Sequence, residues 1–175
     1  MIETDRLLLR QWQDSDLDEW VLMNQDHKVM EFFPSTLTRD QAVHLADKIR
    51  EHIEIHGWGL WAVEVKGIDP FIGFVGLSEQ DMGFEWMPCV EIGWRLKHSA
   101  WGKGYATEAA RAALEFGIPR FGKIYSYTAA INTPSQRVMS KIGLVERPEL
   151  AFEHPRVENP LLKPHVVYCS EAKTA

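Results

Sequence analysis

Two glycines near the middle of the sequence mark the segment with the clearest chemical potential. Gly102 and Gly104 lie between a strand-like run at residues 91–96 and a helical pattern that begins at Tyr105. Glycines in such a turn let the backbone approach a ligand closely and leave amide groups pointing outward. The free amides and the positive dipole end of the following helix also attract anions. This combination predicts a phosphate-binding loop.

Two common phosphate-binding motifs do not fit this loop. A Walker A loop requires the spacing G-x-x-x-x-G-K-[ST], whereas Gly104 is followed by Tyr105. A dinucleotide fingerprint requires G-x-G-x-x-G, but Thr107 stands at the position of the third glycine. The sequence therefore favours a different phosphate-bearing ligand.

The segment resembles the acyl-CoA loop of the GNAT superfamily of N-acetyltransferases, in particular its RimJ/RimL-like branch. That branch typically has E-I-G-[WY]-x-L, a short spacer and W-G-x-G-[YF]-A-T-E-A. The present sequence has EIGWRL at residues 91–96 and WGKGYATEA at residues 101–109, without gaps. The wider superfamily pattern, [RQ]-x-x-G-x-[GA], begins here at Ser99, which is neither Arg nor Gln. This difference is tolerable because backbone amides would hold most of the pyrophosphate.

The resemblance implies acetyl-CoA as co-substrate and no metal ion. Backbone groups at residues 94–96 would pair with the pantetheine arm, and the glycine loop would hold the pyrophosphate. The residues implied to bind acetyl-CoA are Trp94, Leu96, Trp101, Gly102, Lys103, Gly104, Ala106, Thr107 and Asn132. Basic side chains are expected to gather around these segments, namely Arg95, Lys97, Lys103, Arg137 and Lys141.

A second block, NTPSQRVMSKIGL at residues 132–144, predicts a short helix. Thr133 is the expected N-cap, Pro134 suits the first turn, Gln136 would complete a capping box and Gly143 would end the helix. The block resembles the N-x-x-[SA]…G-F segment of the same superfamily. That resemblance implies that Asn132 hydrogen-bonds the pantetheine arm.

Acetyl transfer from a thioester to an amine needs a base, a donor for the oxyanion and an acid for the departing thiolate. Glu91 is the candidate base, because a carboxylate in an apolar cleft has a raised pKa. Many relatives place a tyrosine acid seven residues after the Asn, but Met139 stands there and has no proton to give. Ser135, implied by the resemblance to lie near the thioester sulfur, is then the candidate acid.

Other readings of these residues stay open from sequence alone. Glu91 can equally pair with an arginine, and Ser135 can simply cap its helix. His154 and His165 are further acid–base candidates. Glu108 is expected to complement the dipole of its helix, with Arg111 three residues on. The tryptophans that could line an acceptor pocket are Trp58, Trp61 and Trp86.

Composition narrows the class of protein. At 175 residues and 45% hydrophobic, residues 1–175 are expected to form one globular domain. The resemblance implies that this single domain is an N-acetyltransferase domain. The net charge of −6 argues against nucleic-acid binding. No apolar run approaches the ~20 residues of a membrane span, and no signal peptide is evident, so a cytoplasmic protein is expected. Its two cysteines lie outside the predicted site segments, which favours direct transfer without an acyl-enzyme.

Hydrophobic periodicity predicts the elements that must position these residues. Strands are expected at residues 6–11, 60–65, 72–77, 90–96, 123–129 and 166–169, and helices after Asp14 or Ser15, at 38–57, at 105–116 and at 133–142. This order is typical of an α/β (α+β) mixed sheet. The resemblance implies the acyl-CoA N-acyltransferase fold, with a central, mostly antiparallel sheet, helices on both faces and a splayed parallel strand pair.

The predicted function is acetyl-CoA-dependent transfer of an acetyl group to a primary amine. The RimJ/RimL resemblance favours the N-terminal α-amine of a protein as acceptor. A small amine, such as a polyamine, amino acid or drug, is the alternative, and a non-catalytic acyl-CoA sensor is a further one. An open acceptor groove would indicate a protein acceptor, and a closed pocket a small one. Homodimerisation is expected only by family habit.

Overall fold

The protein is built around one mixed sheet, and the computed structural model describes residues 1–171. The strands are β1 (Ile2–Glu3), β2 (Leu7–Arg10), β3 (Leu60–Val65), β4 (Gly73–Gln80), β5 (Cys89–Leu96), β6 (Ile124–Ala129), β7 (Val145–Glu146), β8 (Phe152–Glu153) and β9 (Pro164–Cys169). The helices are α1 (Leu17–Gln25), α2 (Arg39–His56), α3 (Tyr105–Phe121) and α4 (Thr133–Lys141), with 3-10 turns at Asp14–Asp16, His98–Ala100 and Pro148–Leu150.

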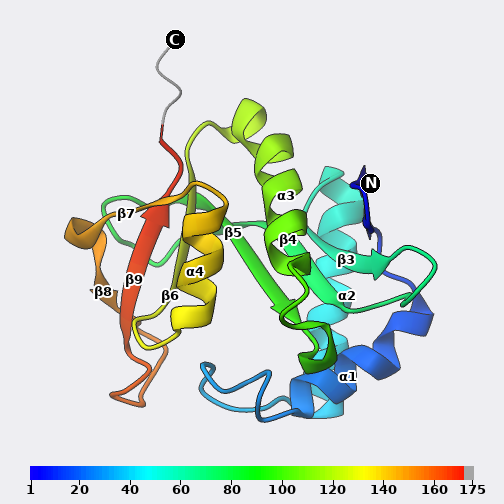
Figure 1. Ribbon diagram of the computed structural model, residues 1–175. Helices are drawn as coiled ribbons and strands as arrows, with labels where there is room; N and C mark the ends of the chain where they lie inside the picture. Colours follow the sequence, from blue (N-terminus) through cyan, green and yellow to red (C-terminus); the bar gives the residue numbers. More distant parts are fainter. Residues whose placement is uncertain (172–175) are drawn as a thin grey trace.

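The strand order is β1-β2-β3-β4-β5-β6-β9-β7, and β8 also pairs with β9. Every pairing is antiparallel except that of β5 with β6. These two strands pair at only two register positions, Val90 with Ile124 and Glu91 with Tyr125. Just beyond them the Ser126 hydroxyl donates to the carbonyl of Ile92 at 2.9 Å. From there the strands separate, as Figure 1 shows, so the predicted splayed parallel pair is confirmed.

Helices cover both faces of the sheet. α3 and α4 lie in front of it in Figure 1, and α2 lies behind it. α3 approaches β4 so closely that a Cβ added at Gly117 would lie 2.7 Å from Cδ1 of Leu77. Because side chains alternate along a strand, Leu77 and its cross-strand partner Ile92 face α3, whereas Glu91 faces the opposite side.

Local signals correctly predicted most of these elements. The Thr38–Gln41 capping box begins α2, and Gly57, at φ 76°, ends it. The N-cap of α4 lies one residue earlier than predicted: it is Asn132, whose side chain accepts from the amide of Ser135. The predicted Thr133 cap is therefore wrong, and the Gln136 side chain instead donates to the carbonyl of Ala130. The short strands β1, β7 and β8 were not predicted.

The core lies between the sheet and its helices, with Trp20, Trp61 and Ile92 among its fully buried side chains. Within residues 1–171, no helix is both long and apolar enough to cross a membrane.

Candidate active site

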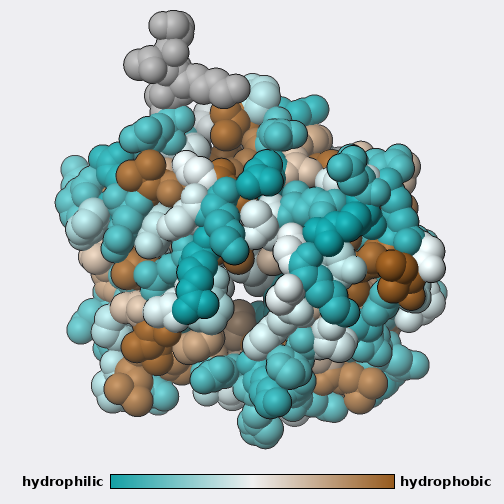
Figure 2. Space-filling model, in the orientation of Figure 1, coloured by the Kyte–Doolittle hydropathy of each residue, from teal (hydrophilic) through white to brown (hydrophobic). Residues whose placement is uncertain are grey.

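The split between β5 and β6 is the centre of the candidate site. Glu91 lies at its root, and Tyr127, two residues beyond the register partner of Glu91, lies on the same face of β6. Figure 2 shows a hollow near the centre of the opposite face, where Figure 1 shows the two strands diverging. Groups from both faces can therefore meet between the strands.

Burial raises the pKa of Glu91 to about 8, and a hydrogen bond from Tyr127 opposes the increase. Burial and the neighbouring carboxylate also raise the pKa of Tyr127, so its hydroxyl keeps its proton. A carboxyl with a pKa near 8 changes protonation in the range where a general base works. The raised pKa expected for Glu91 is thus confirmed, although Tyr127, its neighbour, was not predicted.

Aromatic rings surround this pair on the Glu91 face. Trp86 lies 5.1 Å from Tyr125 and 6.2 Å from Tyr127 between ring centroids, and Phe152 lies 5.6 Å from Tyr127. The rings of His154 and His165 lie beside these aromatic residues, with their centroids 4.9 Å apart. Burial lowers the pKa of each histidine. The face is therefore apolar and aromatic, with neutral histidines at its edge.

The other tryptophans proposed for the acceptor pocket lie elsewhere. Trp61 is 1% exposed and packs edge-on against Phe116 of α3. Trp58 contacts His52 and Phe121. Only Trp86 of the three stands beside the candidate site.

Ser135 and Asn132 form a small network at the start of α4. The Asn132 amide donates to the hydroxyls of Thr128, at 2.9 Å, and Ser135, at 3.2 Å. The Ser135 hydroxyl thus accepts from Asn132, and its own proton stays available for donation. Met139 is 1% exposed and its side chain belongs to the core. Much of the hydrogen-bonding capacity of the Asn132 side chain is used within the protein.

The glycine loop has the geometry of an anion cradle. Gly102 and Gly104 have φ of 73° and 80°, and a Cβ at Gly102 would meet nothing within 4 Å. Gly104 is the N-cap of α3 without a side chain, so the first-turn amides, including those of Ala106 and Thr107, face outward. These features fit a pyrophosphate group. Lys103 is exposed at the tip of the loop.

Two flanking residues have roles within the loop itself. The Trp101 indole donates to the carbonyl of Leu96 at 2.8 Å, while 44% of the residue stays exposed. The Leu96 side chain is buried in the core, and its carbonyl already accepts the hydrogen bond from Trp101. Trp94 lies on the α3 side of β5, where it packs against the core.

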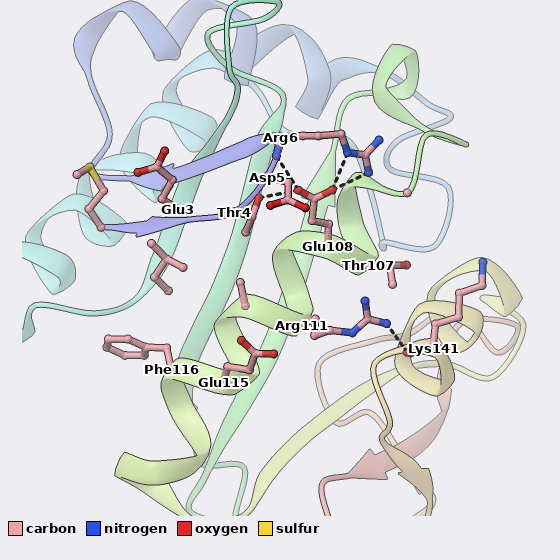
Figure 3. A pocket seen from close by; sticks show the side chains of 14 residues that line it. Glu3, Thr4, Asp5, Arg6, Thr107, Glu108, Arg111, Glu115, Phe116 and Lys141 are labelled. Carbon is pink, nitrogen blue, oxygen red and sulfur yellow. Dashed lines mark hydrogen bonds and ion pairs between the residues drawn. The ribbon is translucent and has the colours of Figure 1, made fainter.

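The N-terminal segment holds the glycine loop in place, as Figure 3 shows. Glu108 of α3 accepts from the hydroxyl of Thr4 at 2.6 Å and from the Arg6 guanidinium at 2.7 Å. Arg6 also donates to the carbonyl of Lys103 at 2.9 Å. Glu108 lies in the first turn of α3, as predicted, but it pairs with Arg6 and not with Arg111, which donates to the carbonyl of Lys141. We call the contacts of Thr4, Arg6 and Glu108 the N-terminal clamp.

Not all of the basic residues expected around the cofactor segments lie there. Lys97 pairs with Glu19 and Asp69, at 3.1 and 3.0 Å. Arg95 points to the Glu91 face and contacts Asn24 of α1. The prediction of a single basic cluster is wrong for these two, because strand alternation and nearby acids direct their side chains away from the loop.

A groove of about 800 Å³ lies along α3 beside the clamp. Its acidic and basic side chains are mixed, with Glu3, Asp5, Glu108 and Glu115 beside Arg6, Arg111 and Lys141. It lies on the α3 side of the sheet, whereas Glu91 faces the other side. The groove is therefore separate from the acid–base pair.

Two further observations concern the cysteine beside Glu91 and the candidate metal ligands of the described residues. Burial raises the pKa of Cys89 to about 12, so this thiol beside Glu91 is a poor nucleophile near neutrality. Residues 1–171 contain no cluster of three or more His, Cys, Asp or Glu side chains suited to a metal ion.

The fold is that of a class of acyl-transferring enzymes, and comparison with known proteins identifies the family. Residues 6–145 match the family described as "Acetyltransferase (GNAT) domain". The chain belongs to the GNAT family and is an N-acetyltransferase. It is 33% identical to "Uncharacterized protein YkkB" of Bacillus subtilis, over 81% of this chain and 83% of that protein. It is 30% identical to "Uncharacterized N-acetyltransferase YnaD" of the same organism, over 82% of this chain and 81% of that protein.

Solved structures show the same fold. A GNAT-family acetyltransferase from Bacillus anthracis superposes with a TM-score of 0.77 at 26% identity, over 96% of each chain. Spermidine N-acetyltransferase from Vibrio cholerae, solved with CoA and spermine, superposes with a TM-score of 0.72 at 22% identity, over 95% of each chain. Ribosomal-protein-S5-alanine acetyltransferase from Vibrio fischeri superposes with a TM-score of 0.75 at 16% identity, over 98% of this chain and 96% of that one. The last two likenesses concern the fold alone.

Proposed function

We propose that the enzyme transfers an acetyl group directly from acetyl-CoA to a small primary amine. The observation that carries this proposal is the Glu91 carboxyl at the root of the β5–β6 split, with its pKa raised to about 8 beside Tyr127. An ammonium group must lose a proton before it can attack, and a carboxylate with this pKa accepts one near neutrality. A cationic amine beside Glu91 would in turn favour the ionised carboxylate.

In this proposal, binding of acetyl-CoA and deprotonation of the amine are assigned to residues on different faces of the sheet. Acetyl-CoA supplies the activated acetyl group, and the amides of the glycine loop, with Gly102 and Gly104, would bind its pyrophosphate. Ser135 would donate its free proton toward the departing thiolate. The acceptor amine would approach from the aromatic face, where Glu91 takes its proton. Cys89 stays a neutral thiol, which supports direct transfer over an acyl-enzyme.

The loop between α1 and α2 favours a small acceptor. The Phe33 ring centroid lies 4.2 Å from Cζ of Arg95 on β5, while Phe32 packs against the small apolar cluster that includes Ala129 of β6. Consecutive residues thus contact both arms of the split, and Figure 1 shows this loop passing below the ends of β5 and β6. An acceptor bound between the two strands would therefore be enclosed at the end where this loop passes. We therefore favour a small amine over the protein N-terminus that the RimJ/RimL-like motifs suggest.

The test is an acceptor screen with the purified enzyme and acetyl-CoA. Small primary amines and short peptides with free N-termini are compared by the rate at which the CoA thiol is released. We expect turnover of small amines to exceed that of peptides, and Phe32→Ala to raise the relative rate of peptides by loosening the loop. A preference for peptides would support the RimJ/RimL-like assignment. Acetyl-CoA binding without acetylation of any amine would support the sensor alternative.

A further inference from the structure

Arg95, near the end of β5, is a cation that has no carboxylate partner among residues 1–171. Its Nη1 donates to Oδ1 of Asn24, and its Cζ lies 4.2 Å from the ring centroid of Phe33 and 5.6 Å from that of Phe74. Its Nε is buried and has no hydrogen-bond partner within residues 1–171. None of the ion pairs within residues 1–171 includes Arg95.

A comparison with Arg10 of β2, which is buried, shows which contacts Arg95 lacks. Arg10 donates Nη1 and Nη2 to the two carboxylate oxygens of Asp16, at 2.8 and 2.9 Å, and its Nε to Glu64 at 3.0 Å. Its pKa is raised by these partners, whereas burial alone lowers the pKa of Arg95 to about 10. A cation withdrawn from water is costly unless an anion and further hydrogen bonds compensate. Aromatic rings satisfy neither Nε nor Nη2 of Arg95.

Arg95 shares its face with the candidate base. Glu91, Gly93 and Arg95 alternate along β5 and therefore point to the same side of the sheet. A Cβ at Gly93 would meet nothing within 4 Å, so the floor between the two side chains is open. Four residues of strand separate the two Cα atoms by about 13 Å. One end of this floor carries the proton acceptor, and the other carries the unpaired guanidinium beneath Phe33.

We infer that Arg95 is a binding subsite for an oxyanion on the acceptor, which is therefore a small molecule with an amine at one end and a carboxylate or phosphate-type group at the other. This inference rests on the proposed function. The amine lies beside Glu91, the linking atoms cross Gly93, and the anion accepts from the Nε–Nη2 edge of Arg95. Two parallel N–H donors match the two oxygens of a carboxylate or a phosphate.

The test compares acceptors that differ only in charge. ω-Amino carboxylates of increasing length are compared with the matching ω-amino amides and ω-amino alkyl phosphonates, using kcat/KM. The wild type should prefer the acids over the amides by about tenfold to a hundredfold, as expected for a charge-assisted bidentate contact. The relative rates of carboxylates and phosphonates show which oxyanion the subsite takes. Arg95→Gln should reduce the preference for acids over amides to about one.

Two controls keep the outcome clear. Arg95→Lys retains the charge but not the fork, so part of the preference should remain. The far-UV circular dichroism and thermal midpoint of each variant show whether it folds. Equal rates for acids and amides in the wild type would overturn the subsite while leaving the amine acetyltransferase intact.

Ligand binding separates the inference from the proposed function. If no amine is acetylated, the proposed function fails, but thermal stabilisation by the same ω-amino carboxylates still tests Arg95. Stabilisation of the wild type and not of Arg95→Gln supports the subsite. Equal stabilisation of both, or of neither, overturns it.

Discussion

At the scale of single residues, the pH dependence of catalysis tests whether Glu91, hydrogen-bonded to Tyr127, acts as the general base. kcat/KM should rise with pH through an inflection near 8, because the Glu91 carboxyl must lose its proton to act as a base. Tyr127→Phe should move the inflection to higher pH, since the Tyr127 hydrogen bond lowers this pKa. Glu91→Gln should lower kcat/KM by about a hundredfold and remove the inflection.

The acceptor amine also titrates, so one acceptor is used for all three proteins. An inflection that persists in Glu91→Gln belongs to the acceptor or to another group. Full activity of Glu91→Gln would contradict the assignment of the base.

The same carboxyl predicts how stability depends on pH. The folded protein holds the Glu91 proton up to about pH 8, whereas an unfolded chain releases it near the ordinary value of 4.5. Between these values the folded state binds more protons, so Glu91 makes the free energy of unfolding decrease as pH rises. Glu91→Gln should therefore raise the thermal midpoint more at pH ~8 than at pH ~4.5. Equal shifts at both pH values would show that burial does not raise this pKa.

Sequence reasoning found some of these residues and missed others for physical reasons. Glu91 lies within a long motif, and its burial follows from the apolar strand around it. Tyr127 belongs to no motif, and its contact with Glu91 depends on the β5–β6 register, which the sequence does not state. The roles of Glu91 and Ser135 in catalysis stay predictions, as do the acetyl-CoA contacts.

At the scale of elements, the glycine loop allows a matched pair of substitutions. Gly102→Asp and Gly102→Asn both place a residue that tolerates positive φ where the added side chain meets open space. The two side chains have nearly the same shape and differ in charge. Gly102→Asp should weaken acetyl-CoA binding by about tenfold more than Gly102→Asn, measured by isothermal titration at low salt. Equal losses would show that the loop does not face a phosphate group.

The N-terminal clamp predicts that Glu108 positions the loop without touching the ligand. Glu108→Gln weakens the contacts with Arg6, so KM for acetyl-CoA should rise several-fold with little change in kcat. The free energy of unfolding should fall by about 1 kcal/mol, because the ion pair is partly exposed. Glu115→Gln, on an exposed position of the same helix, is the control and should change neither quantity. An unchanged KM in Glu108→Gln would exclude the positioning role.

Helices and strands could be predicted from the sequence where a few neighbouring residues encode them. They could not be predicted where only pairing with a distant strand defines them. The capping box of Thr38 and the glycine that follows α2 are encoded within a few residues. β1, β7 and β8 have two residues each, which is too short for a periodic pattern. The cap of α4 was misplaced because Asn132 and Thr133 are both good capping residues, and Asn132 is additionally tied to Thr128 of β6.

At the scale of the whole molecule, the β5–β6 split predicts a change in backbone protection on ligand binding. Within residues 1–171, the backbone ladder between β5 and β6 has two register pairs, and the Ser126–Ile92 hydrogen bond lies just beyond them. Acetyl-CoA bound between them should slow amide hydrogen exchange in both β5 and β6. Gly102→Asp at the same ligand concentration should show a smaller effect. Protection confined to residues 101–108 would place the ligand outside the split.

The position of β9 in the sheet has a consequence for how the protein is made on the ribosome. β9 lies between β6 and β7 and also pairs with β8, although it follows all three in the sequence. The half of the sheet beyond the split therefore lacks its central strand until residues 164–169 leave the exit tunnel. During that interval β6 presents an open edge to other nascent chains, a known route to aggregation. Stalled or truncated products that lack β9 should consequently be more prone to aggregate than products that lack β1.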